Sequence, residues 1–222
     1  MTDVALYGNL DIDTILDNGH TYTDLGSIAN VWQALTELDP TMDVGLSPTD
    51  IGETLVYVDR TAGKRYFKHA KHNTRYQAKI FKSKIHHLMY LNKISDTSFI
   101  HKLDGIVTAD LCPGTPVDKK LLKHVDFLFF ADEDVNNDFE DYVKATKGWC
   151  IQHHSTGSTY SNGQKIKNYN LPKNKILHKG NVLGAGDCFA SVFIKNIIDG
   201  QTNIDKLVSD AHIVTSSRLA KL

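Results

Sequence analysis

Short apolar runs of the fully buried kind alternate along this chain with amphipathic segments. The clearest run is Phe127-Leu128-Phe129-Phe130, in which large apolar residues follow one another without a polar position between them. A strand with such a run is buried on both faces, as happens when helices cover both sides of a parallel sheet. The chain therefore favours an α/β architecture, because a sheet with one solvated face gives alternating apolar and polar residues.

Other segments extend this pattern over nearly the whole sequence. Strands are predicted at 4–7, 54–58, 88–91, 105–108, 127–130 and 175–178. Helices are predicted at 28–38, from Thr115-Pro116 onward, at 134–146 with Gly148 closing it, at 189–198 and at 204–214. Turns at Ala62-Gly63 and Asn162-Gly163 predict hairpins. The sequence thus predicts one α/β domain over residues 1–222, with a small hairpin added around 54–68.

Composition narrows the class of protein. The 222 residues are 41% hydrophobic and 23% charged, as is ordinary for a globular domain. No apolar stretch of about 18 residues occurs, so no transmembrane helix is expected. The start, Met1-Thr2-Asp3-Val4, lacks the basic residues of a signal peptide. Cys112, Cys150 and Cys188 form no C-x-x-C pair, which disfavours a disulfide framework and a zinc ribbon. We expect a cytoplasmic protein that does not partner a membrane.

Charge is balanced overall but not locally. The chain has 25 basic and 26 acidic residues, which disfavours a wholly basic nucleic-acid binder. Between Arg60 and Lys93, however, no acidic residue occurs, while basic residues are frequent. Such a stretch is usually a solvated face, but it could also steer an anionic ligand or contact nucleic acid. The sequence leaves its role open.

The segment Gly184-Ala185-Gly186-Asp187 carries the strongest chemical signal. It opens the helix predicted over 189–198, and its glycines allow the backbone to approach a ligand closely. A helix N-terminus has free N–H groups and a positive dipole end, so it suits a phosphate. Asp187 would lie beside that site as a base for an attacking hydroxyl, a combination that phosphoryl transfer needs. The local alternative is a glycine turn with a helix-capping aspartate.

Three motifs together resemble a known family. Gly-Ala-Gly-Asp-Cys-Phe-Ala at 184–190 resembles the C-terminal signature of the ribokinase-like (PfkB) carbohydrate kinases. Gly8-Asn9-Leu10-Asp11-Ile12-Asp13 resembles the first strand of that family, and Gly26-Ser27-Ile28-Ala29-Asn30 resembles its substrate-binding segment. The resemblance implies a three-layer α/β/α, Rossmann-like fold with a mostly parallel central sheet and a reduced β lid.

The resemblance also implies residue roles and an activity. Asp187 would be the catalytic base, and Gly184, Ala185 and Gly186 would form the anion hole for ATP. The sugar would be bound by Asp13, Gly26, Ser27 and Asn30, with Asp11 as the alternative to Asp13 because both share one face of an extended segment. The implied protein is an ATP- and Mg²⁺-dependent phosphotransferase acting on a hydroxyl of a small sugar or sugar derivative.

Alternatives stay open beside this function. A nucleoside kinase could use the same scaffold, and a catalytically weak, kinase-like binding or scaffold protein is the alternative from another class. A homodimer is compatible with the sequence. Nucleic acid is disfavoured as a partner, because no recognisable binding module is present.

The chain departs from the family at several positions. Asn181-Val182 stand where the family has Asp-Thr near its monovalent-cation loop, which leaves activation by K⁺ open. Ala131-Asp132-Glu133-Asp134 stand in place of Asn-x-x-Glu, so no metal ligand is assigned. Gln152-His153-His154 replace a Thr-x-Gly near the nucleotide. We interpret His86-His87 and His153-His154 as strand histidines without a metal, because adjacent strand residues point to opposite faces.

Overall fold

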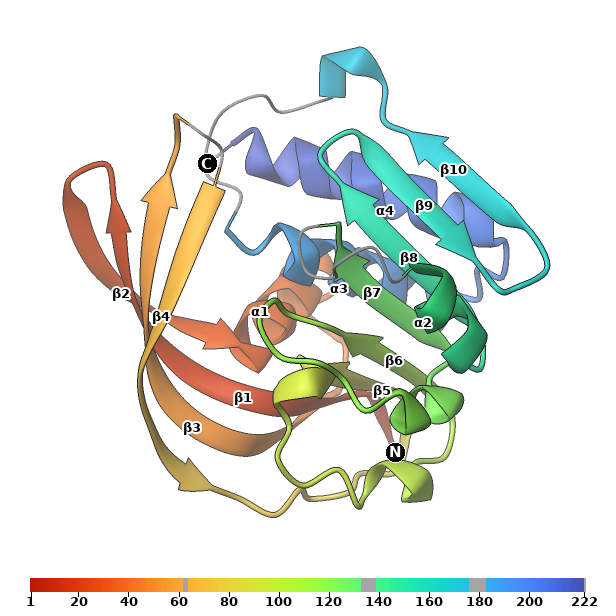
Figure 1. The fold of residues 1–222 in the computed structure, drawn as a ribbon, viewed down its shortest axis with the longest axis horizontal. Helices are drawn as coiled ribbons and strands as arrows, with labels where there is room; N and C mark the ends of the chain where they lie inside the picture. Colours follow the sequence, from red (N-terminus) through yellow and green to blue (C-terminus); the bar gives the residue numbers. More distant parts are fainter. Residues whose placement is uncertain (62–63, 133–138, 176–182, 222) are drawn as a thin grey trace.

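The computed structural model describes residues 1–61, 64–132, 139–175 and 183–221, without the side chains of residues 64, 65 and 69–73. Its strands form one sheet in the order β10-β9-β8-β7-β6-β5-β1-β3-β4, with β2 paired to β1 (Figure 1). The strands are β1 (Thr2–Asp17), β2 (His20–Ser27), β3 (Val44–Asp59), β4 (Lys64–Arg75), β5 (Ser83–Met89), β6 (Ile106–Asp110), β7 (Phe127–Ala131), β8 (Trp149–His154), β9 (Gly157–Ser161) and β10 (Ile166–Asn170).

The central strands are parallel, as the continuous apolar runs predict. Parallel pairing joins β3, β1, β5, β6, β7 and β8 in that order. The β9 and β10 strands continue the sheet with antiparallel pairing. Phe129 and Phe130 of β7 are both fully buried, and they belong to the core clusters on the two opposite faces of the sheet.

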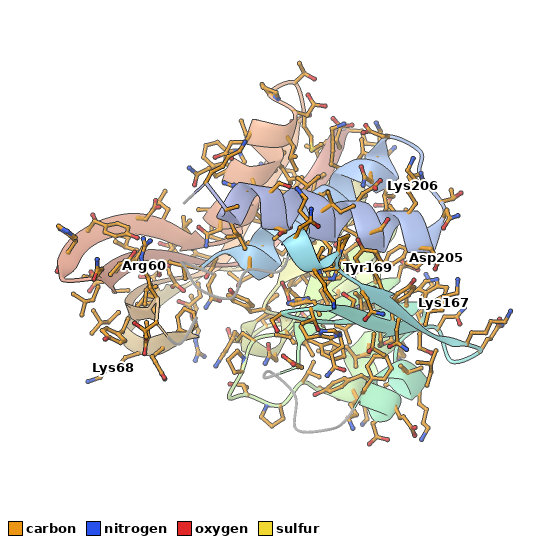
Figure 2. All side chains as sticks on the ribbon, turned by 90° about the horizontal axis from the view of Figure 1, so that it is seen from above. Arg60, Lys68, Lys167, Tyr169, Asp205 and Lys206 are labelled. Atoms are coloured by element: carbon orange, nitrogen blue, oxygen red, sulfur yellow. The ribbon has the colours of Figure 1, made fainter. Side chains whose placement is uncertain are left out.

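Long helices cover one face of the sheet. They are α1 (Ile28–Leu38), α3 (Ala185–Ile198) and α4 (Ile204–Leu219). Val31 and Leu35 of α1 pack with Ile85 of β5, while Phe189 and Phe193 of α3 pack with Phe129 of β7. Lys167 of β10 forms an ion pair with Asp205 of α4, with Nζ and Oδ1 2.8 Å apart, at the end of the molecule seen at the right of Figure 2.

The other face is covered by shorter pieces. These are α2 (Phe139–Ala145) and the 3₁₀ segments η1 (Leu91–Lys93), η2 (Ile100–Lys102) and η3 (Lys119–His124); η4 (Lys173–Lys175) lies near α4. They bury Leu91, Ile100, Leu122 and Tyr142 against Phe130 and its neighbours. The result is the expected three-layer α/β/α arrangement, with one layer built largely from single turns.

A second sheet region, which we call the lid, is built from continuations of two core strands. Beyond a register shift between Gly8 and Asn9, β1 still pairs with β3 and now also with β2. The β4 strand pairs antiparallel with β3 on the other side. The lid therefore has four strands, in the order β2-β1-β3-β4, and projects from the core in Figure 1. The hairpin expected around 54–68 is its β3–β4 part, although its turn at Ala62-Gly63 lies outside the described residues.

Most of the expected elements are present, with corrections at several ends. The strand expected over 88–91 ends at Met89, because Tyr90 adopts φ 54° and starts a 3₁₀ turn. The helix expected from Thr115-Pro116 is wrong: Asp118 caps only the 3₁₀ segment η3, accepting a hydrogen bond from the Lys120 N–H. Lys175 belongs to η4 rather than to a strand, and residues 176–178 lie outside the described residues.

Two further expectations concern α2 and membrane segments. The helix expected over 134–146 is described only from Phe139, and it ends at Ala145. Gly148 does not cap it with a positive φ; a Cβ there would stand 2.1 Å from the Asp126 carbonyl oxygen, so close backbone approach requires the glycine. Among the described residues, no helix has the length and hydropathy needed to cross a membrane.

Candidate active site

One cleft lies where the lid, the carboxyl ends of the core strands and the N-termini of α1 and α3 meet. It contains about 890 Å³ of space between atoms, part of it open to solvent. A cleft at the carboxyl ends of parallel strands is where open α/β sheets bind ligands. Of the residues expected at a site, Asp11, Asp13, Ser27, Asn30, Gly184, Gly186 and Asp187 line it. Gly26 and Ala185 lie directly beside these residues in the chain.

Asp187 lies in the first turn of α3. The helix begins after Gly184, whose φ of 74° is accessible to glycine at no steric cost, and no side chain caps its first N–H groups. The first N–H groups of an α-helix have no partner within the helix itself, and such a helix end is suited to an anion. Asp187 is 6% exposed. The glycine turn thus places both a carboxylate and the N-terminal end of α3 at the cleft.

Asn30 of α1 holds the Asp187 carboxylate from the opposite side. Its Nδ2 donates a hydrogen bond to Asp187 Oδ2 at 2.8 Å. The two helices are also linked further along, where Ser191 Oγ lies 3.4 Å from the Val31 carbonyl oxygen. Asn30 therefore fixes the orientation of Asp187, a role that the sequence did not assign to it.

Ser27 stands at the junction of β2 and α1 in a strained conformation. It adopts φ 58° and ψ −121°, which is uncommon for a residue with a side chain and costs of order 1–3 kcal/mol. Its Oγ donates a hydrogen bond to Asp11 Oδ2 at 3.1 Å. The strained turn places this hydroxyl and the following α1 N-terminus at the cleft.

Asp13 packs against the backbone of Gly26. A Cβ at Gly26 would stand 2.3 Å from Asp13 Oδ2, so only glycine leaves room for this carboxylate. Burial raises the pKa of Asp13 from 3.8 to about 7, and the nearby carboxylates of Asp11, Asp187 and Asp24 contribute to this rise. Asp11 and Asp13 both line the cleft, so the choice between them that the sequence left open stays open.

Comparison with known proteins shows what this arrangement resembles. No family model matches the sequence, and no curated protein matches it. Solved structures do match in three dimensions. A ribokinase from Thermotoga maritima has a TM-score of 0.75 at 15% identity, covering 100% of this chain and 94% of the other. This is a ribokinase-like fold.

Two further structures show the breadth of this similarity. Adenosine kinase from Sinorhizobium meliloti has a TM-score of 0.71 at 13% identity, covering 99% of this chain and 94% of the other. A pyrophosphate-dependent kinase in the ribokinase family, complexed with a pyrophosphate analog and myo-inositol, has a TM-score of 0.70 at 12% identity, covering 97% and 94%. At these identities the similarity establishes the ribokinase-like fold, which confirms the fold class expected from the motifs.

Two cleft residues of this ribokinase-like fold were assigned no role from the sequence, although the resemblance placed residues 152–154 near the nucleotide. His153 near the end of β8 and Asp110 at the end of β6 both lie beside the glycine turn of α3: a Cβ on Gly186 would stand 3.7 Å from His153 Nε2 and 3.8 Å from Asp110 Oδ2. Both lie at or next to the carboxyl end of a parallel core strand, and this position would have indicated a site once the strand order was known.

The basic stretch contributes to the ribokinase-like cleft at its two ends. Phe67 of β4, Tyr90 and Lys93 line the cleft. Lys93 Nζ donates a hydrogen bond to Thr115 Oγ1 at 2.7 Å, which links two loops at the cleft mouth. Arg60 and Lys68 lie on the lid, where Figure 2 labels them. The stretch is thus divided among the lid, the cleft and the core.

The other histidines and cysteines singled out in the sequence have structural roles, so far as the structure describes them. His87 is fully buried and its Nδ1 lies 2.9 Å from Thr108 Oγ1; burial lowers its pKa to about 3, so it is neutral. Cys188 is buried among the α3 core residues. Among the described residues, no group of three or more His, Cys, Asp or Glu could hold a metal ion on its own. Asn181-Val182 and Glu133-Asp134 lie outside the described residues.

Proposed function

We propose that this protein transfers the terminal phosphoryl group of ATP to a hydroxyl of a small sugar or sugar derivative. The observation that carries the proposal is the position of Asp187: it shares one cleft with Asp13 and lies on the uncapped N-terminus of α3. A positioned base and an electrostatic cradle for phosphate are what phosphoryl transfer requires of a protein. The similarity to kinase structures supports the same activity.

In the proposed reaction, Asp187 accepts the proton of the acceptor hydroxyl. The hydroxyl oxygen then forms a bond to the terminal phosphorus while the bond from that phosphorus to the bridging oxygen of ATP breaks, and ADP leaves. The N–H groups of Ala185 and Gly186 stabilise the charge on the transferring group. The hydrogen bond from Asn30 keeps Asp187 aimed at the acceptor.

The acceptor end of the cleft is proposed to be the Asp13 side. Carboxylates accept hydrogen bonds from neighbouring hydroxyls, and Asp13 and Asp11 are both nine-tenths or more buried beside the cleft. Gly26 lets Asp13 occupy its position, and Ser27 holds Asp11. These residues would orient a sugar so that one hydroxyl faces Asp187.

The donor end is compatible with Mg²⁺. Magnesium is usually held by substrate phosphates with one or two carboxylates, not by an all-protein cage. Asp110 offers such a carboxylate next to the anion-binding turn and is 3% exposed. Bound there, Mg²⁺ would neutralise charge on the donor phosphates. Activation by K⁺ stays open.

A nucleoside kinase is the second candidate. The cleft lining includes the aromatic side chains Phe67 and Tyr90, which are suited to stacking on a base. Phe67 is 44% exposed on the lid, so its ring is accessible to a ligand. One of the structural neighbours is an adenosine kinase.

The decisive experiment measures donor consumption across a panel of sugars, polyols and nucleosides. ATP and pyrophosphate are each supplied with Mg²⁺, with and without K⁺, and phosphorylated product is detected by mass spectrometry. The proposal expects one acceptor class to be phosphorylated with ATP, and expects Asp187→Asn to abolish most of that product. If no acceptor is phosphorylated with either donor, the protein is a binding or scaffold protein and the proposal is wrong. Turnover of nucleosides alone selects the second candidate.

A further inference from the structure

His153 is placed at the proposed phosphate-binding end of the cleft by the ends of three strands. It is near the last residue of β8, where its backbone pairs with Ala131 of β7 and Ser158 of β9. The Asp132 N–H also donates to the His153 carbonyl oxygen at 3.1 Å. The position of this residue is therefore set by the sheet.

The ring of His153 has a defined orientation. It packs on Phe189 of α3, with ring centroids 5.5 Å apart at 38°. Its Nδ1 is buried, whereas Nε2 lies on the Gly186 side, 3.7 Å from where a Cβ on that glycine would stand. His153 is also part of the cleft lining. Nε2 therefore lies beside the first turn of α3, where both His153 and Gly186 line the cleft.

The carboxylates near Gly186 suggest a role for the His153 imidazole. Asp110 Oδ2 stands 3.8 Å from the same point above Gly186, and Asp187 follows in the chain. Carboxylates repel a phosphate beside them. Mg²⁺ held at Asp110 would offset part of this repulsion, and a hydrogen-bond donor on the same side would add to that effect. An imidazole with a proton on Nε2 supplies a donor, and a protonated ring also supplies charge.

We infer that His153 is a catalytic residue that donates a hydrogen bond from Nε2 to a terminal phosphoryl oxygen of the donor. The inference rests on the proposed function and adds a side-chain contact to the backbone N–H groups of α3. A charge-assisted hydrogen bond of this kind changes affinity or rate by roughly 10- to 100-fold. Because the contact is to the donor, its loss affects the use of ATP and not the affinity for the acceptor.

The chain offers a matched control on the neighbouring residue. His154 follows on the same strand; its Nδ1 lies 2.9 Å from Thr156 Oγ1, and it is not part of the cleft lining. His153→Gln and His154→Gln therefore make the same chemical change on the two faces of β8. Glutamine keeps a neutral N–H donor, while His153→Ala removes the donor entirely.

Two measurements test the inference. Steady-state kinetics with ATP and the best acceptor give kcat and both KM values, and titration calorimetry gives the affinity for inorganic pyrophosphate without an acceptor. We expect His153→Ala to lower kcat/KM for ATP and the pyrophosphate affinity by at least about 10-fold, with His153→Gln between it and the wild type. Thermal unfolding of each variant confirms that it is folded. His154→Gln should match the wild type in both measurements.

The outcomes separate this inference from the proposed function. If the wild type transfers phosphate but the His153 variants stay within about twofold of it, the inference is wrong and the kinase activity stands. Equal losses in the His154 and His153 variants would assign the effect to β8 as a whole, and an effect on acceptor KM alone would place His153 at the other end; either overturns the inference. If the wild type transfers no phosphate, a His153-dependent affinity for pyrophosphate supports the inference without the kinase, and no such affinity overturns both.

Discussion

Asn30 Nδ2 and Asp187 Oδ2 are 2.8 Å apart, although 157 positions separate the two residues in the sequence. The hydrogen bond joins the first turns of α1 and α3, and so links the segment that follows the lid to the segment that binds phosphate in the proposed function. Folding of the core is required to bring the proposed base into position.

Asp187→Asn tests the proposed base. The replacement keeps the size of the side chain, and its amide oxygen can still accept the hydrogen bond from Asn30, so the fold should be retained. An amide cannot accept the acceptor proton, and general-base contributions are typically 10²–10⁴-fold, so kcat should fall roughly 100-fold or more. Steady-state kinetics measure this, with circular dichroism as the control. Activity within a fewfold of wild type would exclude Asp187 as the base.

Asp13→Ala tests which end of the cleft binds the acceptor and which binds ATP. Loss of hydrogen bonds to a charged group costs roughly 1.5–3 kcal/mol, so acceptor kcat/KM should fall by about 10- to 100-fold. ATP affinity, measured by calorimetry without an acceptor, should be nearly unchanged. A loss of ATP affinity with an unchanged acceptor KM would show that the two ends are assigned the wrong way round.

Asp13→Asn tests how much the raised pKa of Asp13 changes the free energy of unfolding with pH. The pKa of Asp13 rises from 3.8 in the unfolded chain to about 7 in the folded protein. The folded state therefore binds an extra proton, and this contribution to stability is full below pH 3.8 and is lost as pH rises through about 7.

Relative to the wild type, Asp13→Asn should therefore be more stable at pH 8 than at pH 4. The difference is about 2 kcal/mol after allowance for screening by water in the open cleft. Urea unfolding at several pH values measures it. A pH dependence that is identical in the two proteins would contradict the raised pKa.

Gly26→Ala tests the close approach of Asp13 to β2. The added Cβ would stand 2.3 Å from Asp13 Oδ2, so the carboxylate has to move and acceptor KM should rise by roughly 10-fold. A double-mutant cycle gives the control: in an Asp13→Ala background the added methyl group has nothing to displace and should have little further effect. Additive effects of the two changes would mean that Gly26 acts on another group.

Arg60→Ala tests the tip of the lid. Arg60 Nε and Nη2 donate to the two carboxylate oxygens of Asp17, each at 2.7 Å, and Asp17 is 5% exposed. The pKa of Asp17 is lowered by these hydrogen bonds, so the contribution of the pair is present above pH 3.8 and is lost as pH falls through the lowered value.

Without Arg60, amide hydrogens at the ends of β1 and β2 should exchange faster at neutral pH. Hydrogen-exchange mass spectrometry measures this, and Arg60→Lys should protect less than the wild type because an ammonium cannot make the paired contact. Exchange in β6 and β7 serves as the internal control. Unchanged exchange at the lid tip would show that the pair contributes nothing to lid stability.

The sequence predicted the parts of this structure that depend on local pattern. The apolar run at 127–130 is a buried parallel strand, the stripes at 189–198 and 204–214 are helices, and the Asn162-Gly163 turn joins β9 to β10 with φ 85° at Gly163. The glycine turn before Asp187 is at a helix N-terminus, as expected.

Features that depend on distant pairing were missed. The lid part of β1 alternates polar and apolar residues, because Asp11 and Asp13 face the cleft. It was therefore not predicted as a continuation of the apolar strand at 4–7. His153 and Asp110 could be recognised as cleft residues only once the strand order placed the ends of β8 and β6 beside α3. The α-helix expected after Thr115-Pro116 is absent because Asp118 caps a short 3₁₀ segment instead, and the capping residues alone did not distinguish the two kinds of helix.

The β1 and β3 strands run without interruption from the core into the lid, so the two parts of the sheet share these strands. Asn9, Asp11 and Asp13 lie on the lid half of β1, whereas Asp187 lies on α3, which packs on the core sheet. The register shift at Gly8/Asn9 marks the boundary between the two parts of the sheet, where Gly8 has φ 147° and no room for a Cβ beside the Met89 carbonyl oxygen. Because β1 is one continuous strand, the distance from Asp11 and Asp13 to Asp187 depends on the angle that the sheet takes at this boundary.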